Sequence, residues 1–462
     1  MYLYRTEVKG IQAWILGSGK LREIAGASQV IFELADLVRE CAGSCNAHEV
    51  VQAAAGGATL RFASIEELRS FAKWWPVAVS RRAPGLSVVQ AWVNEETSSW
   101  TDLHRRLAEA RNRHFPDLPE AGPLIARAGR TGLPAVDRDL NGTRDRGSVA
   151  ALASFRQSGR RRIRDVLLPG EPHRFVENLD ELPEGYLATI HADANGIGKL
   201  IAGDVVEDKG AFSKALKEAT EESARRAIRG LPRDASKVHC RPIVLGGDDF
   251  TVIVPAREAL TFAREYLTAF EEETQRRSRE LASKLTACAG IAITKPGWPF
   301  HDSHELAESL CSAAKASFRE SGLSGVAFHR VTTALSSDWE DIVRGPLAGA
   351  GTGRSITANP FSLEDLDLLE VLATVARGLP RGSLRQWVTL ARVDLARAQE
   401  HWERLGEVAR LSTPDLLDRF GRALEDLGCD PTTGWARDGR SSPIFDALEW
   451  HQWTKKPKKE VA

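Results

Sequence analysis

Two short acidic motifs in the second half of the sequence have residue types that could bind metal ions and phosphate. The first is HADANGIGK at residues 191–199, and the second is LGGDDF at residues 245–250. Asp193 lies at the end of an apolar segment, and Asp248 and Asp249 stand between two more. Carboxylates suit Mg²⁺ or Mn²⁺, and a pair of such ions can activate a hydroxyl and stabilise a leaving oxygen. These three acids therefore indicate nucleotidyl transfer with a bound divalent ion.

Small residues surround these acids, where a triphosphate would need close access to the backbone. Gly246 and Gly247 permit a tight hairpin turn. The loop from Ala194 to Lys199 exposes backbone amides of the kind that bind phosphate oxygens. The residues expected to bind the nucleotide are Asn195, Gly196, Gly198, Lys199, Gly246 and Gly247.

Other interpretations exist for several of these residues. GGDD alone is also typical of a polar β-turn, and the second acidic motif favours a metal site over that alternative. Lys315 could bind the triphosphate or could be a solvent-facing helix lysine. His191 shares a strand face with Asp193, and we expect a hydrogen-bonded strand histidine rather than a metal ligand.

The elements around the acids predict how they meet. Residues 185–335 alternate as strand, helix, two strands, helix and strand, followed by a helix at 303–321 and an edge strand at 325–330. This βαββαβ order is that of a ferredoxin-like sheet, in which the first and third strands are neighbours. Asp193 and the Asp248–Asp249 pair should therefore converge.

The same βαββαβ order occurs in residues 1–100, which indicates an internal duplication. The equivalent hairpin of this first copy reads AGGAT at residues 55–59, so its glycines are kept while its acids are absent. We expect the first copy to be catalytically degenerate.

Composition limits the remaining possibilities. The chain has 462 residues, 42% hydrophobic and 27% charged, with 62 basic and 63 acidic side chains, which is typical of a globular protein of two to four domains. The net charge of −1 argues against nonspecific binding of duplex nucleic acid. No segment approaches the roughly 18 apolar residues of a membrane span, so we expect a soluble, cytoplasmic protein without membrane contact.

Two regions flank the second copy. Residues 101–184 form an Arg- and Gly-rich linker region whose basic run, residues 160–164, is either a solvated face or a contact for RNA or an acidic partner. Residues 336–462 show helical periodicity, with one long helical pattern at 384–411, and end in the basic tail TKKPKKEVA. The six cysteines are scattered, and we expect buried free thiols.

With these motifs in place, the chain resembles the large polymerase/cyclase subunit of type III CRISPR effector complexes. The resemblance rests on residues 9–31 (KGIQAWILGSGKLREIAGASQVI), HADANGIGKLI from residue 191, LGGDDF, and the segment AGIAITKPGWPFHDSHELAESLCSAAKAS from residue 289. Less specific similarity covers TANPFSLEDLDLLEVL and LPRGSLRQWVTL in the C-terminal region.

The resemblance implies an α+β fold of two ferredoxin-like palm domains followed by an all-helical C-terminal domain. It implies ATP as substrate, a cyclic oligoadenylate as product, Mg²⁺ or Mn²⁺ as cofactor, and CRISPR effector subunits with guide or target RNA as partners. By the same resemblance, the metal ligands are Asp193 with the Ala194 carbonyl, Asp248 and Asp249.

Three departures from the family pattern qualify this assignment. The first palm begins at Met1, so we expect no His-Asp nuclease domain, and the linker lacks the cysteines of a zinc cluster, so we expect no zinc there. Asn195 stands where a second acid is common. The chain is thus also compatible with a compact stand-alone relative, a homodimer, a non-catalytic scaffold that binds guide RNA, or a diguanylate or mononucleotide cyclase.

Overall fold

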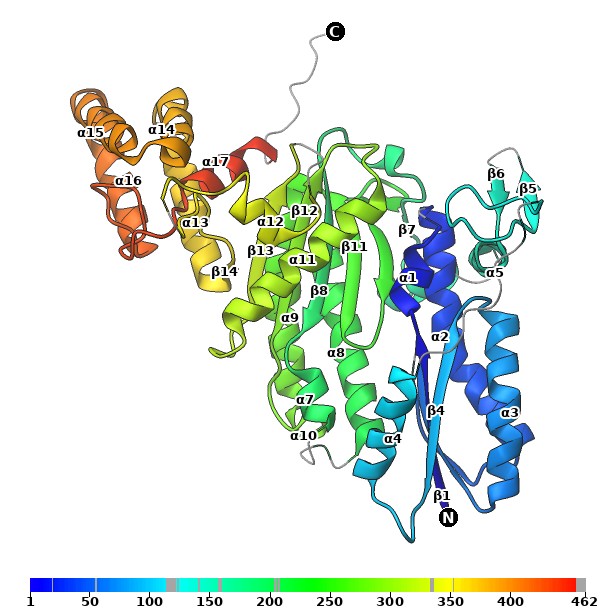
Figure 1. Ribbon diagram of the computed structural model, residues 1–462. Helices are drawn as coiled ribbons and strands as arrows, with labels where there is room; N and C mark the ends of the chain where they lie inside the picture. Colours follow the sequence, from blue (N-terminus) through cyan, green and yellow to red (C-terminus); the bar gives the residue numbers. More distant parts are fainter. Residues whose placement is uncertain are drawn as a thin grey trace.

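Apolar strands and amphipathic helices alternate through the first 94 residues and fold into a four-stranded antiparallel sheet, the first palm (Figure 1). The computed structural model describes residues 1–453, apart from 19, 55, 114–121, 123, 140–141, 157–159, 203–205, 207, 333–335 and 352. The strand order is β2-β3-β1-β4, as the βαββαβ pattern predicts. The elements are β1 (Tyr2–Lys9), α1 (Ile11–Leu16), α2 (Leu21–Ser44), β2 (Glu49–Ala54), β3 (Gly57–Phe62), α3 (Ile65–Arg82) and β4 (Ser87–Asn94).

The region between the two palms contains several short elements. Its helix α4 covers the face of the first sheet that α2 and α3 leave open, with Leu103 and Leu107 in the core there. Its helix α5 packs against α2 so closely that a Cβ on Gly26 would lie 1.9 Å from the Ala151 carbonyl oxygen. The elements are α4 (Trp100–Asn112), β5 (Asp137–Asp139), β6 (Gly142–Arg144), α5 (Arg146–Ser154), α6 (Arg160–Leu167), β7 (Arg174–Phe175) and η2 (Leu179–Glu181).

The basic run of this region contributes one described side chain. Arg164 donates hydrogen bonds to the backbone oxygens of His173 at 3.0 Å and Glu171 at 2.7 Å, so it fastens a loop of its own region. The side chains of residues 160–162 lie outside the described residues.

The second palm repeats the first and extends its sheet. The order β10-β11-β8-β12 matches that of the first sheet, and β13 and the short strand β14 (Phe361–Ser362) continue it beyond β12. Helices α8 and α9 cover one face, while α11 and the first palm lie against the other. The elements are β8 (Leu187–Ala194), α7 (Ile197–Ala202), α8 (Lys209–Arg229), β9 (Lys237–Val238), β10 (Arg241–Leu245), β11 (Asp249–Pro255), η3 (Ala256–Glu258), α9 (Ala259–Arg276), α10 (Ser278–Leu281), β12 (Ala287–Thr294), α11 (Phe300–Phe318) and β13 (Gly325–Arg330).

The two palms share a hydrophobic core. Leu187, Ile243, Ile253 and Phe300 of the second palm belong to the same buried cluster as the side chains between the first sheet and α2 and α3. The face of β8 and β11 that carries these residues therefore points toward the first palm. Asp193 is six residues after Leu187 on β8, and Asp249 is four residues before Ile253 on β11, so both carboxylates share this orientation.

The C-terminal helices extend from the β13 edge of the second palm (Figure 1). The helical pattern over 384–411 is confirmed as two helices, because the chain breaks at Asp394, which caps α15 by accepting a hydrogen bond from the Arg397 amide at 3.1 Å. The two residues of β14, which pair with β13, are an exception to the all-helical expectation. The elements are α12 (Trp339–Arg344), β14 (Phe361–Ser362), α13 (Leu363–Ala376), α14 (Arg381–Val393), α15 (Leu395–Ser412), α16 (Pro414–Asp426) and α17 (Ile444–Trp453).

The predicted fold class is confirmed: two ferredoxin-like units precede a helical region. The predicted basic tail from residue 454 lies outside the described residues. No helix in the described part of the chain combines the length and the apolar character needed to cross a membrane.

Candidate active site

The predicted acids meet at the centre of the second sheet. Asp193, near the end of β8, is the register partner of Asp249, the first residue of β11. Directly opposed residues of an antiparallel pair have Cβ atoms about 5 Å apart, so the two carboxylates share one small volume. Asp248 precedes Asp249 in the hairpin, and all three side chains are half-buried. The predicted convergence of the acids is thus what the structure shows.

The hairpin is shaped around Asp249. The Gly246 amide donates a hydrogen bond to the Asp249 carbonyl at 2.9 Å, and Thr220 of α8 donates one to the Gly247 carbonyl at 3.0 Å. A Cβ on Gly246 would lie 2.2 Å from Oδ1 of Asp249, whereas one on Gly247 would meet nothing within 4 Å. Gly246 is therefore needed for the position of the carboxylate, and Gly247 leaves the outer side of the turn open.

The acids destabilise one another's charges. Burial, and then the carboxylates of Asp248, Asp193 and Glu308, raise the pKa of Asp249 to about 7. Burial and the Asp193 carboxylate also raise the pKa of Asp248. Half-buried carboxylates of like charge attract a cation, because a cation removes their repulsion and restores the ionised forms. This donor set therefore fits a hard divalent ion held by Asp193, Asp248 and Asp249.

Lys315 supplies a positive charge to this site. Its ammonium group pairs with the Asp193 carboxylate and donates a hydrogen bond to the Ala194 carbonyl at 3.0 Å. The alternative of a solvent-facing helix lysine is wrong, since the Lys315 side chain is only 22% exposed. The contacted oxygens of Asp193 and Ala194 are those that the family resemblance assigns to a metal ion.

The loop after β8 turns sharply and is fixed by Asn195. The Asn195 side-chain nitrogen Nδ2 donates a hydrogen bond to Thr286 Oγ1 at 3.0 Å, and the Asn195 backbone amide donates one to the Thr286 carbonyl at 2.8 Å. Gly196 then takes a positive φ of 75°, and Gly198 is exposed in the first turn of α7. The Asn195 side chain thus anchors the loop, while its role toward a nucleotide stays a prediction. The side chain of Lys199 lies outside the described residues.

The first palm lacks an equivalent acid pair. Gly57 begins β3 as Asp249 begins β11, and its register partner on β1 is Glu7. The Glu7 carboxylate pairs with Arg5 and Arg111, so its charge is already balanced by arginines. The observed arrangement agrees with the absence of acids at the first hairpin.

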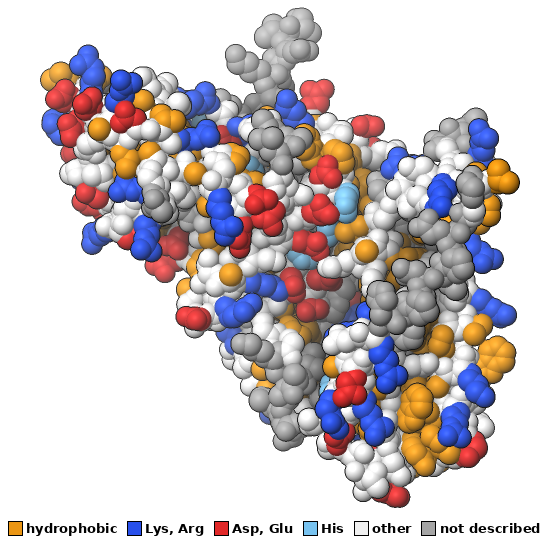
Figure 2. Space-filling view, viewed as in Figure 1, with side chains coloured by type: hydrophobic (Ala, Val, Ile, Leu, Met, Phe, Trp, Pro, Cys, Tyr) orange, Lys and Arg blue, Asp and Glu red, His pale blue; other side chains and the backbone are white. Residues whose placement is uncertain are grey.

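Sequence reasoning missed His304 and Glu308, which extend the polar site along α11. His304, Glu308 and Lys315 lie on one side of this helix, facing His191 and Asp193 of β8. Burial lowers the pKa of His191 to about 4 and that of His304 to about 3, so both imidazoles are neutral. In Figure 2, acidic side chains and histidine gather at the centre of this face, over α11 and the adjoining strands. The spacing of 304, 308 and 315 puts these residues on one face of a helix but does not say what that face meets.

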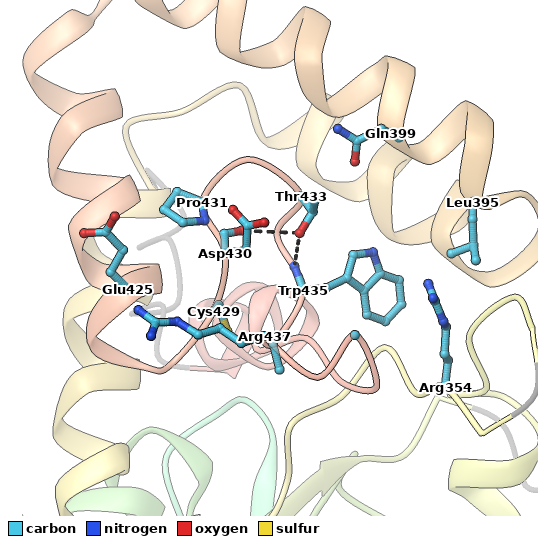
Figure 3. A pocket seen from close by; sticks show the side chains of 12 residues that line it. Arg354, Leu395, Gln399, Glu425, Cys429, Asp430, Pro431, Thr433, Trp435 and Arg437 are labelled. Atoms are coloured by element: carbon cyan, nitrogen blue, oxygen red, sulfur yellow. Dashed lines mark hydrogen bonds between the residues drawn. The ribbon is translucent and has the colours of Figure 1, made fainter.

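A separate cavity of about 580 Å³ lies in the C-terminal region (Figure 3). The Arg354 guanidinium lies over the Trp435 ring, 5.6 Å from its centroid. The Asp430 carboxylate accepts hydrogen bonds from the backbone amide and the hydroxyl of Thr432. These contacts stabilise the 429–439 loop. None of the described residues that line the cavity belongs to the acid site.

The arrangement defines a class of protein: a duplicated palm fold in which the second palm carries the three converging acids. Residues 186–322 match the family model "Cas10/Cmr2, second palm domain". The second palm is accordingly similar to that of Cas10/Cmr2 proteins, which supports the predicted resemblance to the large subunit of type III CRISPR complexes. No curated protein matches the chain in sequence.

Solved structures with this fold are distant in sequence. A Csm1-Csm4 cassette in complex with AMPPNP has a TM-score of 0.60 and 14% identity over 98% of this chain and 70% of that chain. The cassette in complex with cA4 gives 0.54 and 13% over the same shares. Csm1 from T. onnurineus gives 0.50 and 15%, over 97% of this chain and 69% of that chain. At 13–15% sequence identity, these similarities show that this chain and the Csm1 chains share a fold.

Proposed function

We propose that this protein is a nucleotidyltransferase that joins ATP molecules into a cyclic oligoadenylate. The observation that carries the proposal is the pairing of Asp193 with Asp249 across two central strands, with Asp248 beside them. A non-catalytic scaffold has no need for three half-buried acids whose charges repel one another. The second palm retains these acids, while the first has glycine and an arginine-paired glutamate instead.

Each part of the site has a role in this reaction. Asp193, Asp248 and Asp249 would hold Mg²⁺ or Mn²⁺, and the Ala194 carbonyl adds a neutral oxygen. When bound, such ions favour ionisation of the attacking 3′-hydroxyl and stabilise the pyrophosphate that leaves from the α-phosphate. Gly246, Gly247 and the loop of Gly196 and Gly198 leave space for phosphates near backbone amides. As the nucleotide and its metal ion bind, the Lys315 ammonium group would leave the Asp193 carboxylate and contact a phosphate oxygen instead.

The identity of the substrate is proposed from the relatives of this fold. Solved structures of Csm1-Csm4 cassettes are described in complex with AMPPNP, pppApA, cA3 and cA4. AMPPNP is an analogue of ATP, and pppApA, cA3 and cA4 are adenine-nucleotide ligands named in those complexes. By the same comparison we propose a Csm4-like subunit as a partner within a type III CRISPR complex.

The experiment is incubation of the purified chain with each NTP and Mg²⁺ or Mn²⁺, with products identified by mass spectrometry. The wild type is expected to convert ATP, and the D248A/D249A variant is expected to lose turnover by at least about 10³-fold. Asp302→Ala is the matched control, because Asp302 is an exposed acid at the start of α11. Full activity in the double variant contradicts the proposal. Products from GTP alone would instead support a diguanylate cyclase.

If the wild type forms no product, nucleotide binding should be measured next. ATP binding that depends on Mg²⁺ and on the three acids would indicate an enzyme that waits for an activator, such as a partner complex with target RNA. No binding of any nucleotide would favour the scaffold alternative.

A further inference from the structure

A second group of metal-binding side chains lies next to the acid site but is chemically different from it. His191 of β8 and His304 and Glu308 of α11 each present a ligand atom, and these atoms lie within 4.8 Å of one another. His191 is two residues before Asp193 on the same strand face, so the two groups are about 7 Å apart along the strand. Both histidines are buried, and Glu308 is half-buried.

The two histidines are oriented in different ways. Nδ1 of His191 lies 3.0 Å from the Thr251 hydroxyl, which leaves Nε2 of this ring for another partner. Nδ1 of His304 is buried, has no hydrogen-bond partner among the described residues, and lies 3.6 Å from Oε2 of Glu308. An imidazole nitrogen that is buried without a partner is costly, and a metal ion would satisfy it.

The carboxylate of Glu308 is also positioned by a second contact. Its Oε1 accepts a hydrogen bond at 2.8 Å from Gln12 of α1, in the first palm, while its Oε2 is the oxygen nearest His304. Thr251 and Gln12 thus contact the outer atoms of His191 and Glu308. Partners of this kind fix the tautomer and direction of metal ligands.

We propose that His191, His304 and Glu308 bind a divalent transition-metal ion of the Zn²⁺ class, in a site distinct from the Mg²⁺ site of the aspartates. Two imidazoles and one carboxylate suit Zn²⁺, whereas Mg²⁺ prefers oxygen ligands alone. Zinc ligands lie about 2 Å from the ion, so the three side chains need to close by about 1 Å. Three protein ligands leave a fourth position for water or a phosphate oxygen. Through Gln12, the ion also links the two palms.

Cobalt titration of the metal-free full chain tests this proposal without measuring turnover. Co²⁺ reports tetrahedral coordination by its visible absorption, and millimolar Mg²⁺ in the buffer occupies the aspartate site. We expect one Co²⁺ per chain, displaced by Zn²⁺. His304→Gln and Glu308→Gln should each weaken the affinity at least about 10²-fold, and Gln12→Ala about 10-fold.

Two controls separate this site from its neighbours. His301→Gln alters an exposed histidine of the same helix that pairs with Glu305 at 3.0 Å, and it should leave the affinity unchanged. D248N/D249N should also retain the cobalt spectrum, even if the proposed nucleotidyl transfer proves wrong. Circular dichroism checks that each variant is folded. The proposal is overturned if the folded wild type shows no saturable tetrahedral spectrum, or if that spectrum depends on the aspartates but not on His304.

Discussion

At the scale of single residues, Gly246 and Gly247 are adjacent but differ in what a methyl group would meet. Gly246→Ala places a Cβ 2.2 Å from the Asp249 carboxylate, whereas Gly247→Ala places one in open space. We expect Gly246→Ala to reduce nucleotidyl transfer about 10²-fold, because displacement of a ligand by about 1 Å disturbs the reaction geometry. Gly406→Ala in α15 of the C-terminal region is the control, since a Cβ there would also meet nothing within 4 Å, and it should retain activity within a few fold. Initial rates with ATP measure both, and equal loss in the two variants would contradict this account.

Lys315 tests whether a cation is needed among the three acids. Lys315→Gln leaves Asp193 without its ammonium partner, so we expect a lower melting temperature in EDTA and recovery of most of the loss with Mg²⁺. Turnover should fall about 10-fold to 10²-fold, because a phosphate contact is also removed. Lys284→Gln is the control, because it breaks the pair of an exposed lysine with the half-buried Glu271, which includes none of the three acids, and it should change neither quantity. A stability loss that Mg²⁺ does not reverse would indicate a packing role instead.

The residues of the site differ in how far the sequence could predict them. The opposition of Asp193 and Asp249 follows from the βαββαβ order, which makes the first and third strands neighbours and fixes which strand ends meet. His304 and Glu308 could not be placed, because α11 carries them on a mostly apolar buried face and periodicity alone does not give the rotation of a helix against a sheet. Gly290 of β12 shows this contact, since a Cβ there would lie 1.9 Å from the Ala307 carbonyl.

At the scale of elements, the C-terminal helices are anchored by a buried carboxylate. Asp446 of α17 accepts hydrogen bonds from the Thr357 hydroxyl at 2.6 Å, the Ala358 amide at 2.8 Å and the Asn359 amide group at 2.7 Å. Burial raises the pKa of Asp446 to about 7, and these donors oppose that shift. The unfolded chain has an aspartate pKa near 4. The folded state therefore binds this proton more tightly than the unfolded state does.

Stability should consequently fall as the pH rises toward 8. The contribution of protonated Asp446 is complete below about pH 4 and is lost as the pH rises through about 7. Urea unfolding at pH 5, 6, 7 and 8 should show wild type losing on the order of 2 kcal/mol more than Asp446→Asn over this range. The variant itself should be less stable at every pH by about 1–3 kcal/mol, because its amide group cannot accept the same bonds. Parallel pH profiles for the two proteins would contradict the assignment to Asp446.

At the scale of the whole molecule, the two palms share one hydrophobic core. The stability of the second palm, which carries the acids, should therefore depend on the first palm. Ile24 of α2 is fully buried in the cluster that also contains Ile243 and Ile253 of the second palm. Ile24→Ala is expected to lower the free energy of unfolding by about 3–4 kcal/mol. If the palms open as one cooperative unit, amide protons of β8 and β11 should lose as much protection as those of β1 and β3.

Native-state hydrogen exchange measures this coupling directly. Val393→Ala is the control, because Val393 is 73% exposed at the end of α14 and its loss should alter protection in neither palm. Loss of protection confined to the first palm would show that the two sheets open independently, and the metal and nucleotide sites of the second palm would then not need the first for their stability. Loss in both would mean that the palm without acids is retained as half of the core on which Asp193 and Asp249 are positioned.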